Sequence, residues 1–178
     1  MPYAANEDLP DSVREALPAR AETIWREAFN SAAEQYGEGD EGRLTAVAWS
    51  AVRKSGYGKG PEGRWLPMSE LQRITYRPTE RMRQNAALAL EVRATKPPSQ
   101  RGMTPVGLAR ARDLANGRPI SFSTVQRMYS YLRRHEVDKQ GKTWDERGKG
   151  WQAWQGWGGD AALRWSASIL REALGDAR

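Results

Sequence analysis

Hydrophobic side chains in the first third of the chain recur at steps of three and four residues, which is the spacing of amphipathic helices. One run follows Pro18 and stops at Gly37, and a second run stops at Gly56. The two runs predict two helices that pack together as a hairpin. The segment 57–65 is rich in glycine and proline, so it favours a tight loop or a short β-ribbon.

The remainder of the chain carries further helix signals, and no strand-like alternation of any length follows residue 68. Thr79 and Thr104 are suited to cap helices, and Ser123 opens a capping-box pattern. Asp160 is suited to cap a last helix. This part of the chain is therefore predicted to be all-α.

The predicted fold class is mainly α, with two small units in one chain. A length of 178 residues is sufficient for two units that each close a core of their own. We place a small helical domain at residues 1–67, a linker or short edge element at 68–78, and a basic, tryptophan-rich helical module at 79–178.

Charge is distributed unevenly between these parts. Residues 1–67 hold 8 Lys/Arg and 11 Asp/Glu, whereas residues 68–178 hold 20 and 11. Most of the positive excess lies in residues 68–139, which hold 14 basic and 6 acidic side chains. Such an asymmetry indicates a basic surface that binds an anionic partner, most often nucleic acid. The alternative is a solvated basic face that only keeps the protein in solution.

Composition also excludes several kinds of chemistry. The chain has no cysteine and one histidine, which removes disulfides, thiolate zinc sites and thiol nucleophiles, and we expect no metal and no cofactor. No window approaches the roughly 20 apolar residues of a membrane span, and the N-terminus lacks the order of a signal peptide. We therefore expect a cytoplasmic protein that does not enter a membrane.

A series of short motifs falls in order along the N-terminal third. It comprises Met1-Pro2-Tyr3, Asp8-Leu9-Pro10, Val13, Leu17-Pro18, Ile24–Ala32, Tyr36, Val47–Val52 and Tyr57-Gly58-Lys59-Gly60. In identity and spacing the series resembles the ChaB family of small proteins. The resemblance implies a compact helical domain, and the family carries the label of a cation-transport regulator.

A second series covers roughly residues 79–172. It comprises Arg81–Ala86, Leu90–Arg93, Gly107–Asn116, Ser123–Met128, Arg134-His135, Val137–Lys139 and Trp157–Asp160. This series resembles a helical module found in bacteriophage and prophage proteins. The resemblance implies a phage or mobile-element origin, and it allows an association with the virion.

The predicted helices at 105–116 and 123–135 invite comparison with a helix-turn-helix. The second helix carries Arg127, Tyr131 and Arg134 opposite its apolar stripe, where they could contact phosphates or enter a major groove. The connection between the helices is longer than the usual three or four residues, and a solvated outer face is the alternative. The candidate nucleic-acid-binding residues are Arg110, Arg112, Arg118, Arg127, Tyr131, Arg133 and Arg134.

Five of the eight tryptophans fall within residues 144–165. Rings on one helical stripe are usually core residues, which is one interpretation. The other interpretations are base stacking and a protein-docking surface made by Trp151, Trp154 and Trp157. A phage or host protein would then be the partner.

The pair His135 and Asp138 is the one grouping with a catalytic pattern, a base beside a carboxylate, and it is a weak signal. Walker-type loops, nucleophile elbows and paired metal motifs do not occur in the sequence. We therefore expect a non-enzymatic accessory protein that binds nucleic acid, with DNA as the expected kind. The alternatives are a protein-interaction or virion-assembly component and, from the family label, a regulator of cation transport.

Overall fold

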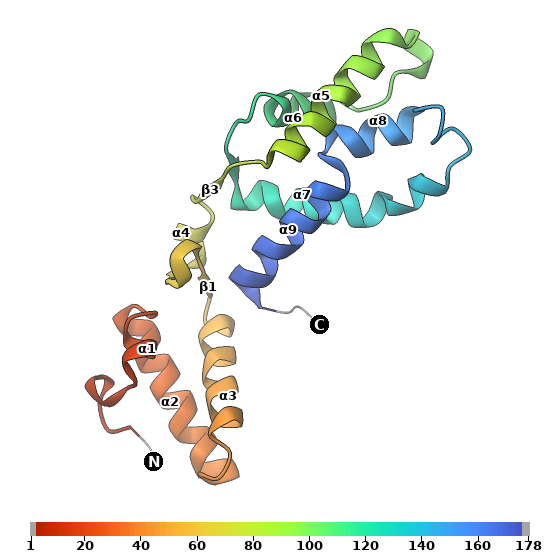
Figure 1. Cartoon of the computed structure of the whole chain (residues 1–178). Coiled ribbons are helices and arrows are strands. Elements are labelled where there is room, and N and C mark those ends of the chain that lie inside the picture. The colour runs from red at the N-terminus through yellow and green to blue at the C-terminus, as the bar shows by residue number, and fades with distance from the viewer. Residues whose placement is uncertain (1–2, 176–178) are drawn as a thin grey trace. The chain divides into compact units, whose positions relative to one another are not determined.

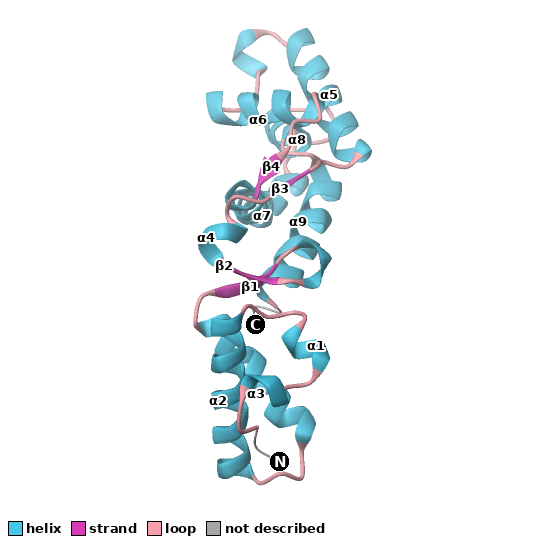
Figure 2. Ribbon diagram, turned by 90° about the vertical axis from the view of Figure 1, so that its left-hand side faces the viewer, coloured by secondary structure: helices cyan, strands magenta, loops and turns pink. Residues whose placement is uncertain are grey.

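The computed structural model describes residues 3–175, and helices dominate it (Figures 1 and 2). Met1, Pro2 and residues 176–178, which belong to the motifs and modules expected above, lie outside the described residues. The chain divides into two compact units. Among the described residues, the first unit consists of residues 3–72 together with 172–175, and the second consists of residues 73–171. The predicted mainly α fold class is confirmed.

The first unit is built on the predicted helix hairpin. A short helix α1 (Asp11–Arg14) precedes α2 (Ala19–Tyr36) and α3 (Glu41–Lys54), and α2 packs against α3. Gly37 ends α2 with a φ of 78°, a conformation that costs glycine little. The carboxylate of Asp40 accepts a hydrogen bond from the N–H of Arg43 and so begins α3. The turn chemistry of the sequence therefore sets the bounds of both helices.

Aromatic rings fill the core of the first unit. The rings of Trp25 and Phe29 stack with centroids 5.0 Å apart, and the Trp25 side chain is 1% exposed. Trp49 contacts Trp25 edge to face and stacks on Trp65 at 5.0 Å. Such ring pairs bury a large apolar area for few side chains, which is how a unit of this size closes a core.

The glycine-rich segment forms the second of the two predicted alternatives, a short β-ribbon (Figure 2). Strands β1 (Tyr57–Lys59) and β2 (Trp65–Pro67) pair antiparallel, with Lys59 opposite Trp65. A 3-10 turn at Pro61–Gly63 (η2) connects them. The helix α4 (Met68–Leu71) follows directly, so part of the region expected as a linker is ordered as a helix.

The second unit contains most of the remaining helices (Figure 1). Helix α5 packs against α6 and α8, and α7 contacts α8. The elements in order are β3 (Thr75–Tyr76), α5 (Glu80–Thr95), η3 (Pro98–Gln100), α6 (Pro105–Ala115), β4 (Ile120–Ser121), α7 (Phe122–His135), η4 (Glu136–Gln140), α8 (Lys149–Gly156) and α9 (Gly159–Leu174).

Two of the predicted helix starts hold and two do not. The hydroxyls of Thr79 and Thr104 cap α5 and α6, as expected. Helix α7 begins earlier than predicted, because the hydroxyl of Ser121 rather than Ser123 accepts the N–H of Thr124. Asp160 lies inside α9, where its carboxylate binds Lys139 instead of serving as the N-cap.

The expectation of an all-α second unit is wrong in one detail. Strands β3 and β4 pair antiparallel, with Thr75 opposite Ser121 and Tyr76 opposite Ile120. The N–H of Phe122 then donates to the carbonyl of Ile74 at 3.1 Å. Strands of two residues are too short to show an alternating pattern, which is why the sequence did not reveal β4. Strand β3 falls in the region 68–78, where a short edge element was one of the two expectations.

The core of the second unit is formed by buried apolar side chains from every large helix. The buried residues of this core are Met82, Ala86, Leu114, Ile120, Val125, Met128, Leu132, Trp154, Trp157 and Ala162.

None of the described helices is both long and apolar enough to cross a membrane.

Candidate nucleic-acid interface

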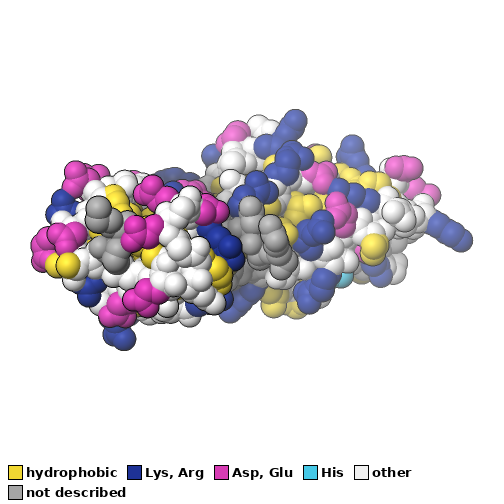
Figure 3. Space-filling model, turned by 90° about the horizontal axis from the view of Figure 1, so that it is seen from below, with side chains coloured by type: hydrophobic (Ala, Val, Ile, Leu, Met, Phe, Trp, Pro, Cys, Tyr) yellow, Lys and Arg dark blue, Asp and Glu magenta, His cyan; other side chains and the backbone are white. Residues whose placement is uncertain are grey.

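The structure divides the predicted set of arginines into paired and unpaired side chains. Arg110 and Arg118 both bind the carboxylate of Asp113, with N–O distances of 3.5 and 3.1 Å. Arg133 binds Glu136 at 3.1 Å. These three cations have part of their charge compensated locally. On the face drawn in Figure 3, basic side chains also stand apart, with acidic and apolar side chains between them.

Arg127 and Arg134 form the most open basic feature that remains. Both side chains are exposed on α7, and neither forms an ion pair with another described residue. They are seven residues apart, which is two helical turns or about 10 Å along the axis. They line a shallow hollow of about 340 Å³ that we call the α7 stripe. Its members are Ser123, Gln126, Arg127, Ser130 and Arg134.

The α7 stripe is chemically suited to phosphate. Two guanidinium groups, two hydroxyls and one amide supply hydrogen-bond donors, and the stripe contains no carboxylate. Arg112, the remaining predicted arginine, is exposed near the end of α6 and forms no ion pair within the described part of the chain. Three of the six predicted arginines therefore keep an uncompensated charge.

Tyr131 does not belong to the α7 stripe, and its contact with nucleic acid stays a prediction. Its ring lies between those of Trp157 and His135, with centroid distances of 4.5 and 4.3 Å. Burial raises the pKa of the Tyr131 hydroxyl, and the nearby charge of Asp138 raises it further. The hydroxyl therefore stays protonated in neutral solution and can donate a hydrogen bond.

The stacked rings of Tyr131 and Trp157 and the tilted ring of His135 form one wall of a larger hollow of about 520 Å³, which we call the aromatic hollow. It lies where the end of α7 meets the first residues of α6 and α8. Two cations and one acid share it with the rings. The lining residues are Arg101, Gly102, Met103, Thr104, Gly107, Tyr131, His135, Asp138, Lys149, Gly150, Ala153 and Trp157.

Glycine at two lining positions lets the walls approach closely. A Cβ on Gly102 would lie 2.6 Å from the carbonyl oxygen of Lys149, closer than real Cβ contacts. A Cβ on Gly150 would lie 3.2 Å from the Cβ of Asp138. Met103 has a φ of 68°, which is rare for a residue with a side chain. The backbone at Met103, which lines the hollow, is therefore held in a conformation of high energy.

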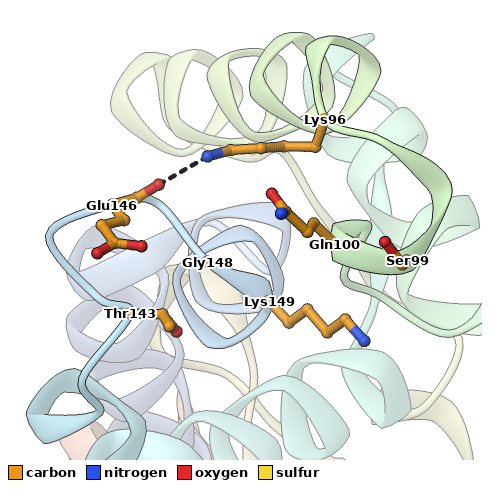
Figure 4. A pocket seen from close by; sticks show the side chains of 7 residues that line it. All are labelled: Lys96, Ser99, Gln100, Thr143, Glu146, Gly148 and Lys149. Carbon is orange, nitrogen blue, oxygen red and sulfur yellow. Dashed lines mark hydrogen bonds between the residues drawn. The ribbon is translucent and has the colours of Figure 1, made fainter.

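A smaller polar pocket of about 280 Å³ lies on the other side of the α8 start (Figure 4). The ammonium of Lys96 reaches across it and donates to the carbonyl of Glu146 at 2.9 Å. Lys149 lines both this pocket and the aromatic hollow. In Figure 4 the ammonium of Lys149 points away from Glu146. The charge of Lys149 is therefore not compensated by the Glu146 carboxylate.

The buried side chain of Gln152 holds the two loops between which these hollows lie. Its oxygen accepts from the N–H of Gly102 at 2.8 Å. Its amide nitrogen donates to the carbonyls of Gln100 and Arg147 at 3.2 and 3.0 Å. Gln152 is fully buried and its bonds are made to loop backbone, so its role is to fix the positions of the loops.

The tryptophans expected to bind a partner lie mostly in the core. Trp154 is 1% exposed and Trp157 is 9% exposed, so the expected docking surface of three rings is corrected. Trp151 alone of the three is half-buried, with the guanidinium of Arg147 at 5.3 Å from its ring. The spacing of three residues had left the core and the docking interpretations open, and the core interpretation describes Trp154 and Trp157.

His135 and Asp138 do form the pair that their spacing suggested. The Nδ1 atom of His135 lies 3.1 Å from a carboxylate oxygen of Asp138. Both side chains are partly exposed in the aromatic hollow. Among residues 3–175 no group of three or more His, Asp or Glu side chains could hold a metal ion. The pair therefore fixes the plane of the imidazole ring at the hollow.

The two units together define a class of protein, a small helical domain with an aromatic core joined to a basic helical module. Residues 9–68 match the ChaB family. The ChaB protein of Escherichia coli K12 is 44% identical over 73 residues, which cover 36% of this chain and 95% of that protein. ChaB of Shigella flexneri gives the same values. The chain belongs to the ChaB family, and no solved structure matches it.

Proposed function

We propose that this chain is a non-enzymatic accessory protein that binds DNA through its second unit. The observation that carries the proposal is the α7 stripe, where Arg127 and Arg134 lie beside hydroxyl and amide donors without an acidic partner. Two turns of helix span about 10 Å, which corresponds to roughly three base-pair steps of the duplex. Each arginine can therefore contact a different phosphate.

The charge of the two units supports the same conclusion. Residues 73–171 hold 19 Lys/Arg and 8 Asp/Glu, whereas the rest of the chain holds 9 and 14. The excess of basic over acidic side chains is therefore larger within the structural unit 73–171 than within residues 68–178, the part that follows the boundary expected from the sequence. Positive charge on one unit favours long-range attraction of a polyanion, and contacts to phosphate carry no sequence information by themselves.

The proposal includes an origin and a setting. The resemblance of residues 79–172 to phage and prophage modules supports a phage or mobile-element origin, and a DNA partner places the action in the cytoplasm of a bacterial host. The cation-transport label in the names of the relatives concerns proteins that align with 36% of this chain. The DNA-binding proposal rests on residues outside that alignment.

The test is a salt titration of binding to a labelled DNA duplex, followed by fluorescence anisotropy. If phosphates carry the affinity, the logarithm of the binding constant falls linearly with the logarithm of the salt concentration between about 50 and 200 mM. The double variant Arg127→Ala/Arg134→Ala should lower that slope by about 1.8, because each phosphate contact contributes about 0.9.

The matched control is Arg118→Ala, which removes an exposed arginine that already binds Asp113. It should change the slope by much less than the double variant does. Binding that does not depend on salt, or a double variant that binds like the unchanged protein, would overturn the proposal. In that case docking to another protein through the surface around Trp151 becomes the better explanation.

A further inference from the structure

We propose that the aromatic hollow binds a nucleoside monophosphate, as presented by the unpaired 5′ end of a DNA strand. The inference rests on the proposed DNA binding for its biological source, but it uses a different site from the α7 stripe. The hollow of about 520 Å³ lies in the size range of small-ligand sites. Rings, cations and an unpaired N–H donor lie on its walls.

The rings provide a platform for a base. Tyr131 covers one face of the His135 imidazole, and no other described ring covers the second face. Asp138 holds the ring through Nδ1 at 3.1 Å, so the orientation of that second face is fixed before a ligand arrives. A base placed on it would extend the existing row of three rings. Base stacking on side chains of this kind is strong and tolerates any sequence.

The cations mark where the phosphate would lie. Arg101 and Lys149 line the hollow, and neither has an ion-pair partner among residues 3–175. The Nε atom of Arg101 donates to the carbonyl of Lys96, which leaves its terminal nitrogens for a ligand. Lys149 is also the first residue of α8, whose N-cap Gly148 has no side chain to occupy the free N–H groups. A helix start of this kind attracts anions.

Two further groups give the ligand a direction. Asp138 repels a phosphate, and its carboxylate lies both 3.1 Å from Nδ1 of His135 and beside Gly150, so the phosphate belongs with the side chains of Arg101 and Lys149. The indole Nε1 of Trp157 lies 3.4 Å from the position of a Cβ on Gly107 and donates no hydrogen bond within the described structure. Trp157 is 9% exposed, and its Nε1 is not one of the buried atoms without a partner, so solvent or a ligand can reach it. An unused donor so placed is suited to an acceptor on the sugar or the base.

The experiment measures binding of AMP, adenosine and inorganic phosphate to the full-length chain by isothermal titration calorimetry. AMP should bind at least about fivefold more tightly than either adenosine or phosphate, because only AMP uses both the rings and the cations. Phosphate that binds as tightly as AMP would reduce the hollow to a simple anion site and overturn the inference. The absence of AMP binding would also overturn it.

Matched variants separate the two parts of the site. Lys149→Ala should weaken AMP about fivefold or more, whereas Lys142→Ala, an exposed lysine outside the hollow, should not. His135→Ala should weaken AMP, and His135→Phe should restore most of the loss because it keeps a flat ring. Thermal unfolding shows that each variant is folded. Equal affinities for all four variants would overturn the assignment to this hollow.

A last comparison distinguishes the source of the nucleotide and keeps the two proposals separate. The strand end is supported as the ligand if a short 5′-phosphorylated single strand binds more tightly than both its 5′-hydroxyl form and AMP. If AMP binds more tightly than the phosphorylated strand, the ligand is a free nucleotide. Arg127→Ala/Arg134→Ala should weaken duplex binding and lower its salt slope, as expected above, and should leave AMP binding unchanged. AMP binding without duplex binding overturns the proposed function alone, and the reverse overturns this inference alone.

Discussion

The side-chain oxygen of Gln152 accepts the backbone N–H of Gly102, 50 residues earlier in the chain, at 2.8 Å. The same side chain donates to two further loop carbonyls, and no part of it is exposed. One buried amide thereby joins the loop before α6 to the loop before α8. Both the polar pocket and the aromatic hollow lie along this junction, so its loss should be felt in stability and in binding.

Replacing Gln152 with alanine should lower the free energy of unfolding by about 1–3 kcal/mol or more. The change leaves a buried N–H and two carbonyls without partners, and an unsatisfied buried group costs about that amount. Urea unfolding followed by circular dichroism measures the loss. Gln140→Ala, on an exposed glutamine, is the control and should stay within about 0.5 kcal/mol of the unchanged protein. Similar values for the two variants would contradict the structural role of Gln152.

Tryptophan substitutions should separate a core ring from a surface ring. Trp154→Ala removes a side chain that is 1% exposed and should cost about 3–5 kcal/mol. Trp151→Ala removes a half-buried ring and should cost far less. Thermal unfolding of both variants checks this order. If Trp151→Ala proves the more destabilising, the assignment of Trp154 to the core of the second unit is wrong.

A methyl group on Gly102 should disturb the start of the aromatic hollow. The new Cβ would lie 2.6 Å from the carbonyl oxygen of Lys149, and backbone cannot move aside cheaply. Gly102→Ala should therefore destabilise the chain by about 1–3 kcal/mol, as overpacked sites do. Gly39→Ala is the matched control, because a Cβ there meets no atom within 4 Å. Chemical denaturation that ranks the two variants equally would refute the close approach.

The stability of the chain should decline in alkaline solution partly because of Tyr131. Burial raises the pKa of its hydroxyl above the ordinary 10.0, so the unfolded chain releases that proton first. The contribution of Tyr131 is therefore complete below about pH 10 and is lost as the pH rises through the folded-state value. Tyr131→Phe should reduce the loss of stability above pH 10, as measured by urea unfolding at several pH values. The same alkaline loss in both proteins would count against this cause.

Local sequence signals predicted much of the fold, and contacts between distant segments account for what they missed. Thr79 and Thr104 cap helices because a hydroxyl and the N–H three residues later are neighbours in the chain. The ladder of Tyr76 with Ile120 depends on the folded core, and two-residue strands leave no pattern.

In the candidate site, too, the features that local sequence signals predict differ from those that depend on contacts between distant segments. The pairing of Arg110 with Asp113 and of Arg133 with Glu136 spans three residues on a helix, so the sequence contained the signal that these cations are partly neutralised. The aromatic hollow had such a signal only in part, because Tyr131, His135 and Asp138 are three and four residues apart in the chain. Its rings come from α7 and from Trp157, which the fold brings together across many residues.

The pairing of β3 with β4 decides where the chain can be cut. A fragment that begins at residue 79 retains every large helix of the second unit but lacks Thr75 and Tyr76, the partners of Ser121 and Ile120. The edge at Ile120 then has unsatisfied backbone groups, which invites aggregation between copies. The basic module should therefore be excised before Arg73, where its compact unit begins.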